Sequence, residues 1–324
     1  MIKRIFIRKI PLTIALSLAL LLSGTLGYAA SLKVASFNIQ FLGHFKDKDD
    51  ESLATLMESF DLVFVQELVA PPVSGTYPDG SPYKADAESK GFFDAMASRG
   101  FSYVLSEEDT GTGPKNHKAS SATEWFVAFY NPLRVSPAPD LPHGFLANDR
   151  SDHPDYERVP YAFPFRAGNA DLVFISVHLQ PGRSQKETAR RAHEFESMFA
   201  WINEQESPER DYVILGDMNI EDCEELAGIM PAGYASLNGD CIPTNTNPKG
   251  PKPYDHVIYN TAHSAQEMSD SRFKVVDLVD AMGGLWDPNE GVFPGSPYKH
   301  IEFRMRYSDH HPVAFVVSTR SDDD

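Results

Sequence analysis

The feature that most constrains the fold of this chain is a series of short apolar runs rich in β-branched and aromatic residues. Several runs are apolar at consecutive positions, a pattern typical of strands that are buried on both faces. The runs are LKVASFNI, LVFVQEL, FSYVLS, EWFVAFY, RVPYAFPF, LVFISVHL, DYVILGDMN, YDHVIY and HPVAFVV. Because such strands must be covered on both sides, the pattern predicts sheets that pack face to face.

Helical patterns are fewer. The clearest covers residues 184–205, where Ser184 and Glu187 match a capping box. An apolar stripe follows at helical spacing, formed by Phe195, Met198, Phe199 and Ile202. Two weaker helices are predicted in ESLATLMESF and ESKGFFDAMASRG. We therefore predict an α/β (α+β) fold: a four-layer αββα sandwich of two packed mixed β-sheets flanked by helices.

Residues 1–29 have the pattern of a signal peptide. Basic residues precede the apolar run IPLTIALSLALLL, and Gly27 and Ala29 suit cleavage after Ala29. An uncleaved membrane anchor is the alternative, but the apolar run is short for a bilayer span of about 20 residues. We expect an exported protein, extracellular or periplasmic. Residues 30–324 would form a single domain, monomeric and with no stable membrane association after cleavage.

Charge limits the kinds of partner. Without residues 1–29, 25 Lys and Arg stand against 46 Asp and Glu, which gives a net charge of −21. This balance argues against a protein that coats DNA or docks on anionic membranes through net charge. It does not exclude an enzyme that approaches phosphates through a bound cation.

Two cysteines, Cys223 and Cys241, are present. In an exported protein we expect them to form a disulfide, and two buried free thiols are the alternative. Because the loop between them is short, the bond would contribute on the order of 3 kcal/mol.

Six of the predicted strands carry polar side chains at one terminus. These side chains are Asn38 and Gln40, Glu67, His178, Asp217 and Asn219, Asp255 and His256, and Asp309 and His310. Burying such groups without partners would cost several kcal/mol, and a core strand does not need them. A capped polar loop explains one such end, but six together indicate a shared site at one edge of the packed sheets.

The residue types in this set indicate a class of chemistry. Oxygen ligands without a cysteine cluster suit Mg²⁺, Mn²⁺ or Ca²⁺. Two separate histidines can act as acid and base near neutral pH, and carboxylates on other strands can hold each imidazole in one tautomer. The combination fits metal-assisted attack of water on a phosphate ester.

The motifs SFNIQ, VFVQE, SVHLQPG, ILGDMN, YDHVIY and SDHHPV occur in the order found in the endonuclease/exonuclease/phosphatase superfamily. From about residue 32 to residue 318 the chain resembles this superfamily, which has the deoxyribonuclease I-like fold. Each motif alone is a weak signal, whereas all six in order are a strong one. The resemblance implies a divalent-metal-dependent phosphodiesterase.

Matched position by position, the resemblance implies roles for nine residues. Those beside the metal are Glu67, Asn38 and Asp309. Those that act in catalysis are His178, His310, Asp217, Asn219, Asp255 and Glu124. Among the latter, Glu124 and Asp255 would orient the two histidines, and Asp217 and Asn219 would contact the phosphate and the attacking water. His311 is expected to be a bystander, and a structural role is favoured for His44, His117 and His256.

The chain also departs from the family pattern. The deoxyribonuclease branch often places arginines after the FNI and QE motifs, where they touch DNA, but here those places hold Gln40, Leu68 and Val69. The preference for double-stranded DNA is therefore in doubt. The insertion VAPPVSGTYPDGSPYKADAES, residues 69–89, has no assigned place and is a candidate for shaping substrate access. Cys223 lies near a disulfide cysteine of that branch, whereas Cys241 is displaced.

Two basic groups flank the predicted site in the sequence. They are Arg183, Lys186, Arg190 and Arg191, and then Lys299, Arg304 and Arg306. Both groups could neutralise phosphates locally, and ion pairing on a helix face explains the first group equally well.

The resulting hypothesis is an exported endonuclease that hydrolyses DNA phosphodiester bonds with Mg²⁺, or with Mn²⁺ or Ca²⁺. A sphingomyelinase-type lipid phosphodiesterase is an alternative that would need an apolar membrane-facing loop. A phosphatase of sugar or inositol phosphates would need a denser basic pocket. A non-catalytic binding protein on the same fold is the alternative of another class, and the intact set of polar residues argues against it.

Overall fold

The structure is a computed structural model that describes residues 31–111, 123–147 and 154–322. The predicted signal peptide, residues 1–29, and His117 lie outside the described residues. Two mixed β-sheets form the centre of the molecule. Within the described ranges, no helix is both long enough and apolar enough to cross a membrane.

The first sheet has the strand order β14-β15-β1-β2-β6-β5. Its strands are β14 (Lys274–Val275), β15 (Val313–Ser318), β1 (Ser31–Leu42), β2 (Leu62–Leu68), β6 (Trp125–Tyr130) and β5 (Ser102–Leu105). The pair β1 and β2 is parallel, and the other pairs are antiparallel.

The second sheet has the order β12-β13-β11-β10-β9-β7, and β8 also pairs with β9. Its strands are β12 (Tyr234–Ser236), β13 (Asp255–Asn260), β11 (Tyr212–Asp217), β10 (Ala170–His178), β9 (Tyr161–Ala167), β7 (Ser136–Pro137) and β8 (Gly144–Phe145). Here β10 and β11 are the parallel pair.

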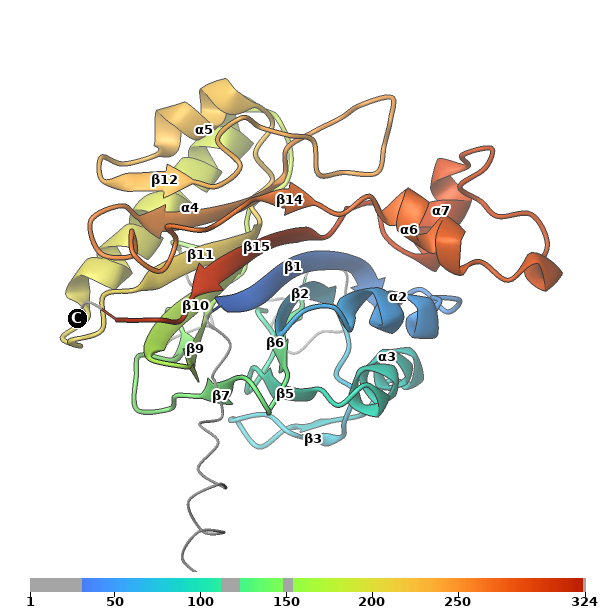
Figure 1. Ribbon diagram of the computed structural model, residues 1–324, viewed down its shortest axis with the longest axis horizontal. Coiled ribbons are helices and arrows are strands. Elements are labelled where there is room, and N and C mark those ends of the chain that lie inside the picture. Colours follow the sequence, from blue (N-terminus) through green and yellow to red (C-terminus); the bar gives the residue numbers. More distant parts are fainter. Residues whose placement is uncertain (1–30, 112–122, 148–153, 323–324) are drawn as a thin grey trace, which may run out of the picture.

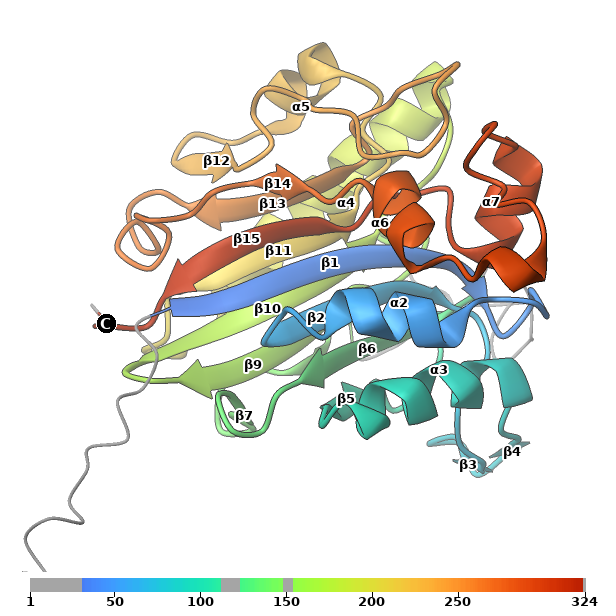
Figure 2. The same ribbon diagram turned by 45° about the vertical axis from the view of Figure 1, so that its right-hand side comes forward.

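Helices cover the outer face of each sheet (Figures 1 and 2). The first sheet is covered by α2 (Asp50–Met57), α3 (Ala87–Ser98), α6 (Leu278–Leu285) and α7 (His300–Arg306). The second is covered by α4 (Gln185–Glu204) and α5 (Cys223–Ile229). A short 3₁₀ helix, η2 (Pro288–Glu290), lies between α6 and α7.

Three apolar layers hold this arrangement together. The layer between the sheets is rich in phenylalanine, with Phe64, Phe163 and Phe174 in contact. The two outer layers lie beneath the helices, and the predicted stripe of the longest helix packs in one of them. Burial on both faces explains the consecutive apolar positions of the strands. The predicted four-layer fold is confirmed.

Local signals also agree with the fold. The helix predicted at residues 184–205 is α4, and Ser184 and Glu187 form the predicted capping box. The insertion 69–89 contains a small hairpin of β3 (Gly75–Thr76) and β4 (Pro82–Tyr83) and the start of α3. Figure 2 shows this hairpin at the end of the sandwich where β1 reaches its carboxyl terminus.

Candidate active site

Three neighbouring strands of the second sheet bring polar side chains to the same level. His178 ends β10 and pairs with Asp217, which ends β11, and Asp255 begins β13 opposite Asp217. Because β13 runs antiparallel to the other two, its first residue meets their last residues at one edge. Asn38 of the first sheet donates a hydrogen bond to Asp217 at 2.9 Å, so this edge joins the two sheets.

Interruptions in the strand pairing orient some side chains of the cluster. The pairing of β2 with β6 is interrupted between Val65 and Leu68, and that of β1 with β2 between Asn38 and Leu42. Glu67 lies in the first interruption with φ of 61°, in the left-handed region that side chains rarely adopt. Bulges re-aim side chains, and strained residues gather at functional sites. The backbone therefore supports a functional role for Glu67.

Asp217 is the centre of the cluster. Its Oδ2 lies 3.5 Å from Nε2 of His178 and 3.5 Å from Nε2 of His310. Its Oδ1 accepts a hydrogen bond from the backbone N–H of Asn219 at 2.9 Å. Burial raises the pKa of Asp217, but His310, His178 and the hydrogen bonds from Asn219 and Asn38 together outweigh burial, and the pKa is lowered. An ionised carboxylate therefore faces both histidines.

Each imidazole is held by a second buried carboxylate. Nδ1 of His178 lies 2.9 Å from Oε2 of Glu124, and Nδ1 of His310 lies 2.8 Å from Oδ2 of Asp255. When Nδ1 donates to its carboxylate, Nε2 is the atom that exchanges a proton with a substrate. The arrangement therefore provides two oriented acid–base groups.

The pKa values of both histidines are shifted in the same direction. Burial lowers the pKa of His310, but Asp255 and Asp217 raise it well above its ordinary value. Burial likewise lowers the pKa of His178, and Glu124 and Asp217 contribute to a net increase. Both imidazoles thus retain a proton at a higher pH than free histidine does. Such perturbed groups in one cluster are typical of catalytic sites.

Glu67 lies beside this pair of histidines. Its Oε1 accepts a hydrogen bond from Nδ2 of Asn38 at 2.9 Å, and its Oε2 accepts one from the backbone N–H of Phe41 at 3.0 Å. Burial raises the pKa of Glu67, an effect that His178 partly offsets. Ligand atoms of Glu67, His178 and Asp217 all lie within 4.8 Å of one another, which is compact enough to hold a metal ion.

The donor set fits a divalent cation. Four carboxylates are buried in the cluster: Glu67, Glu124, Asp217 and Asp255. A cation would offset their concentrated negative charge, and carboxylate oxygens are the ligands that hard cations prefer. Asn38 contacts two of these carboxylates, because its Nδ2 donates to Glu67 and Asp217 while its Oδ1 accepts from the backbone of Gln40. It therefore positions Glu67 and Asp217.

Asp309 is paired with an arginine. Its carboxylate lies 3.0 Å from a terminal guanidinium nitrogen of Arg304, whose Nε donates to Oε1 of Gln40 at 3.2 Å. Among the described residues, Asp309 does not belong to the compact group formed by Glu67, His178 and Asp217. Its charge nevertheless contributes to the raised pKa of Glu67. Asn219 has φ of 52° and donates from Nδ2 to the carbonyl of Leu179 at 3.1 Å.

Two residues that sequence reasoning did not assign support the cluster through hydrogen bonds. Oγ1 of Thr244 donates to Oδ2 of Asp255 at 2.6 Å, and Oγ of Ser308 donates to the carbonyl of Asn38 at 2.6 Å. Burial lowers the pKa of Lys48 to about 7, against the opposing effects of Glu67 and other acids. Ser308 lies within the SDHH motif, which was a usable signal. Thr244 and Lys48 lie in loops without a motif.

Four members of the two basic groups form ion pairs with carboxylates of the protein. Arg191 is fully buried and pairs with Glu225, and it also donates to the carbonyls of Gln180 and Gly182. In the second group the partners are Glu302 for Lys299, Asp309 for Arg304, and Asp49 and Glu290 for Arg306. Ion pairing within the protein accounts for Arg191. In the second basic group, Arg304 contacts a predicted site residue, Asp309.

His256 and His311 make hydrogen bonds outside the cluster. Nδ1 of His256 lies 3.0 Å from Oγ of Ser236, and burial lowers the pKa of His256 to about 4. Nδ1 of His311 accepts from the backbone N–H of Leu278 at 2.9 Å. His44 is exposed. The buried contact of His256 and the backbone contact of His311 agree with the roles favoured for these two residues from the sequence.

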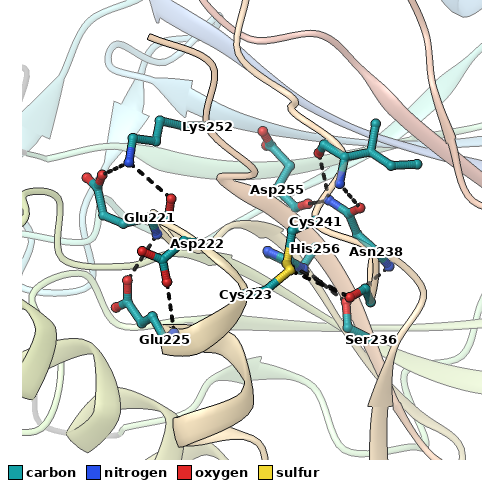
Figure 3. The surroundings of a disulfide bond; sticks show 12 residues. Glu221, Asp222, Cys223, Glu225, Ser236, Asn238, Cys241, Lys252, Asp255 and His256 are labelled. Carbon is teal, nitrogen blue, oxygen red and sulfur yellow. Dashed lines mark hydrogen bonds and ion pairs between the residues drawn. A yellow bond between two sulfur atoms is a disulfide. The ribbon is translucent and has the colours of Figure 1, made fainter.

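Cys223 and Cys241 form a disulfide, so the expected bond is present in the structure. It links the start of α5 to the segment that follows β12 (Figure 3). In that segment Nδ2 of Asn238 donates to the carbonyls of Asp255 and Ile242 at 3.2 Å and 3.1 Å. The disulfide therefore braces the chain next to Asp255.

The sequence profile of the Endonuclease/Exonuclease/phosphatase family matches residues 35–310. The chain belongs to this family. Its members are hydrolases that act on phosphate esters and generally depend on divalent metals. A search of curated proteins finds no match.

Solved structures with the same fold include family members from distant organisms. A family protein from Leptotrichia buccalis C-1013-b has 12% identity and a TM-score of 0.54, with 89% of this chain and 99% of that chain covered. Danio rerio TDP2 complexed with single-strand DNA product has 14% identity and a TM-score of 0.53, covering 90% and 100%. The human Nocturnin catalytic domain with bound sulfate has 13% identity and a TM-score of 0.52, covering 90% and 95%.

Proposed function

We propose that the protein is a divalent-metal-dependent phosphodiesterase that hydrolyses nucleic acid, with DNA as its principal substrate. The observation that carries the proposal is the pair of histidines whose Nε2 atoms both lie 3.5 Å from Oδ2 of Asp217. Each histidine is also held at Nδ1 by its own carboxylate. A hydrolase that splits a phosphodiester needs two such proton carriers, one for the attacking water and one for the leaving oxygen.

In the proposed reaction, water attacks phosphorus in line with the leaving oxygen. Of His178 and His310, the one that is neutral takes the proton of the water, and the other, as an imidazolium, protonates the leaving oxygen. Asp217 lies between them and stabilises the imidazolium that forms. Glu124 and Asp255 keep both rings oriented throughout, and Asn219 supplies a donor beside Asp217.

The metal would be held by Glu67 with Asp217, positioned by Asn38. Asp309 is close enough to influence Glu67 and would join the metal if its pair with Arg304 opened. When bound, a divalent ion such as Mg²⁺ neutralises charge on the phosphoryl oxygens. Mn²⁺ and Ca²⁺ are the other candidates for these oxygen ligands.

Two observations support nucleic acid as substrate. The structurally similar D. rerio TDP2 was crystallised with a single-strand DNA product. In this chain Arg304 reaches Gln40, which stands where the deoxyribonuclease branch often has a DNA-contacting arginine. A cation from α7 is thus available at that position.

A lipid phosphodiesterase is the second candidate, favoured by one observation. The segment around α7 exposes large apolar side chains, with Val292 70% and Ile301 71% exposed. This segment leads directly into Asp309 and His310. Exposed apolar side chains on a segment that precedes site residues are a feature that an enzyme acting at membranes would require.

The test is a cleavage assay of the purified protein without residues 1–29. Supercoiled plasmid, linear duplex DNA, single-stranded DNA and RNA are incubated with Mg²⁺, with Mg²⁺ plus Ca²⁺, or with EDTA. We expect metal-dependent cleavage of DNA that is lost in His310→Ala and retained in His263→Ala, a control at an exposed histidine. If nucleic acid stays intact in every lane and sphingomyelin in vesicles is hydrolysed, the nuclease function is wrong and the second candidate takes its place.

We also propose export through the signal peptide at residues 1–29. The basic start, the apolar run and the small residues before Ala29 support it. The measurement is the mass of the protein recovered from periplasm and medium after expression with its own N-terminus. A start at Ala30 is expected, and a protein retained in the cytoplasm with residues 1–29 intact would contradict it.

A further inference from the structure

A pocket of about 330 Å³ lies where β2 ends and β6 begins. It is lined by the insertion that follows β2, from Val69 to Asp86, and by Asp109, Thr123 and Trp125. Thr123 and Trp125 are the chain neighbours of Glu124, which holds His178. Val69 follows Glu67 by two residues. The pocket therefore borders two elements that carry site residues, and the proposed reaction does not use it.

Three aromatic rings form one wall of this pocket. Tyr77 stacks on Trp125 with ring centroids 5.8 Å apart and an interplanar angle of 27°. Tyr83 lies 5.0 Å from Trp125 and 4.9 Å from Tyr77. Every ring packs against the other two. Because Trp125 is only 2% exposed, Tyr77 and Tyr83 form the accessible part of the wall. Such a wall suits a flat partner that extends the stack.

The polar groups of the pocket are mainly acidic. Asp86 and Asp109 line it, together with Lys84. Asp86 caps α3 and lies 3.5 Å from the amine of Lys46. Asp109 accepts from the backbone N–H of Gly111 at 2.7 Å and from the hydroxyl of Tyr77. Two fixed carboxylates repel a phosphate but accept hydrogen bonds from amino groups. The pocket is therefore suited to the uncharged part of a nucleotide.

We propose that this pocket receives a nucleobase of the substrate strand while the adjoining phosphate lies in the active site. The inference rests on the proposed function, and it names the part of the substrate that the insertion 69–89 recognises. The base stacks on the half-buried rings of Tyr77 and Tyr83, which Trp125 supports from beneath, with its amino group toward the acidic side of the pocket. Stacking depends little on which base is present. The pocket should therefore discriminate strongly between a strand with bases and an abasic strand, and only weakly among the four bases.

The test separates binding from cleavage. In the His310→Ala background, fluorescence anisotropy measures binding of a labelled single-stranded DNA octamer and of an abasic octamer with the same phosphates. We expect the base-bearing strand to bind about tenfold more tightly. Tyr77→Ala is expected to remove most of this difference. Tyr77→Phe, which keeps the ring, should preserve it, as should Tyr103→Ala, an aromatic change outside the pocket.

Equal binding of both strands to the His310→Ala protein would overturn the inference. An equal loss of affinity for both strands in Tyr77→Ala would also overturn it, because that result would indicate general damage to the protein. Competition by phosphocholine but not by a nucleoside monophosphate would also overturn it and would indicate a cationic head group. Base-dependent binding without any cleavage by the unsubstituted protein would contradict the proposed function and leave this inference standing.

Discussion

At the scale of single residues, the site is built from side chains that hold one another. Glu124 shows this most clearly, because one carboxylate oxygen serves two neighbours. Its Oε2 lies 2.9 Å from Nδ1 of His178 and accepts the backbone N–H of Glu67 at 3.0 Å. Glu124 therefore orients a proton carrier and also fixes the strained backbone of Glu67.

Glu124→Gln tests this role. Glutamine retains an oxygen that can accept from the backbone of Glu67, but it removes the negative charge beside His178. We expect the turnover number to fall by about 10²-fold or more with a small change in KM, since an imidazole loses its orienting acid. Steady-state kinetics on DNA would measure it. Unchanged turnover would mean that Glu124 is only a structural strand-end residue.

His256 gives a prediction for stability as a function of pH. Burial lowers its pKa from 6.5 to about 4 in the folded protein, so between these values the unfolded chain binds more protons. Its contribution to stability is therefore complete above pH 6.5 and is lost as the pH falls toward 4. At pH 4.5 the loss would be about 2 kcal/mol.

The measurement is urea unfolding at pH 7 and pH 4.5 for the unsubstituted protein and for His256→Asn. Asparagine offers a polar atom to Ser236 but does not titrate. The free energy of unfolding should fall by less in the variant between the two pH values. An identical fall in both proteins would exclude His256 as a source of acid sensitivity.

At the scale of elements, the close approach of β10 and β11 brings His178 and Asp217 together. Gly216 makes this approach feasible. It has φ of 137°, and a Cβ built on it would lie 2.1 Å from the carbonyl oxygen of Val177. Because the obstructing atom belongs to the backbone of the neighbouring strand, any side chain at this position would push the two strands apart.

Gly216→Ala should therefore destabilise the fold by at least about 2 kcal/mol. Gly228→Ala is the matched control, because Gly228 lies in α5 and its added Cβ would meet nothing within 4 Å. That change should be neutral or slightly stabilising, since alanine favours helix. Chemical denaturation measures both variants. Equal stabilities of the two variants would contradict the steric argument.

The disulfide acts at the same scale, by tying α5 to the chain near Asp255. Its cysteines are separated by 18 residues, and a loop of this size corresponds to about 3 kcal/mol. The double change Cys223→Ser and Cys241→Ser should lower the free energy of unfolding by about this amount. Reducing agent should destabilise the unsubstituted protein but not the double variant. If reducing agent lowered the free energy of unfolding equally in both proteins, the disulfide would not be responsible for the difference in stability.

At the scale of the whole molecule, negative charge is the dominant property. The chain has a formal net charge of −17, and four buried carboxylates lie in the cluster. A bound divalent ion should therefore stabilise the fold, by about 2.7 kcal/mol at 100 times its Kd. We expect MgCl₂ to raise the melting temperature by several degrees.

Salt also screens the overall charge, so NaCl at matched ionic strength is the control for the MgCl₂ experiment. The part of the shift that is specific to Mg²⁺ should disappear in Glu67→Gln. A shift of the same size in NaCl, or in the variant, would show that screening alone is responsible and would argue against a metal site at Glu67.

The sequence by itself determined the layers and the site edge. Consecutive apolar positions can only be satisfied by strands covered on both faces, and polar residues at strand ends avoid burial without partners. The capping box of Ser184 and Glu187 likewise fixed the start of α4, because it depends on neighbours along the chain. These features depend on local pattern, which the sequence records directly.

Only the tertiary structure decided which side chains meet. Thr244 supports Asp255, Lys48 lies near Glu67, and Arg304 pairs with Asp309, although no local pattern links these residues. The bulge that gives Glu67 its left-handed backbone also appears only when β2 pairs with its neighbours. Such contacts join segments far apart in the chain, so they depend on how the sheets pack and not on any spacing within the sequence.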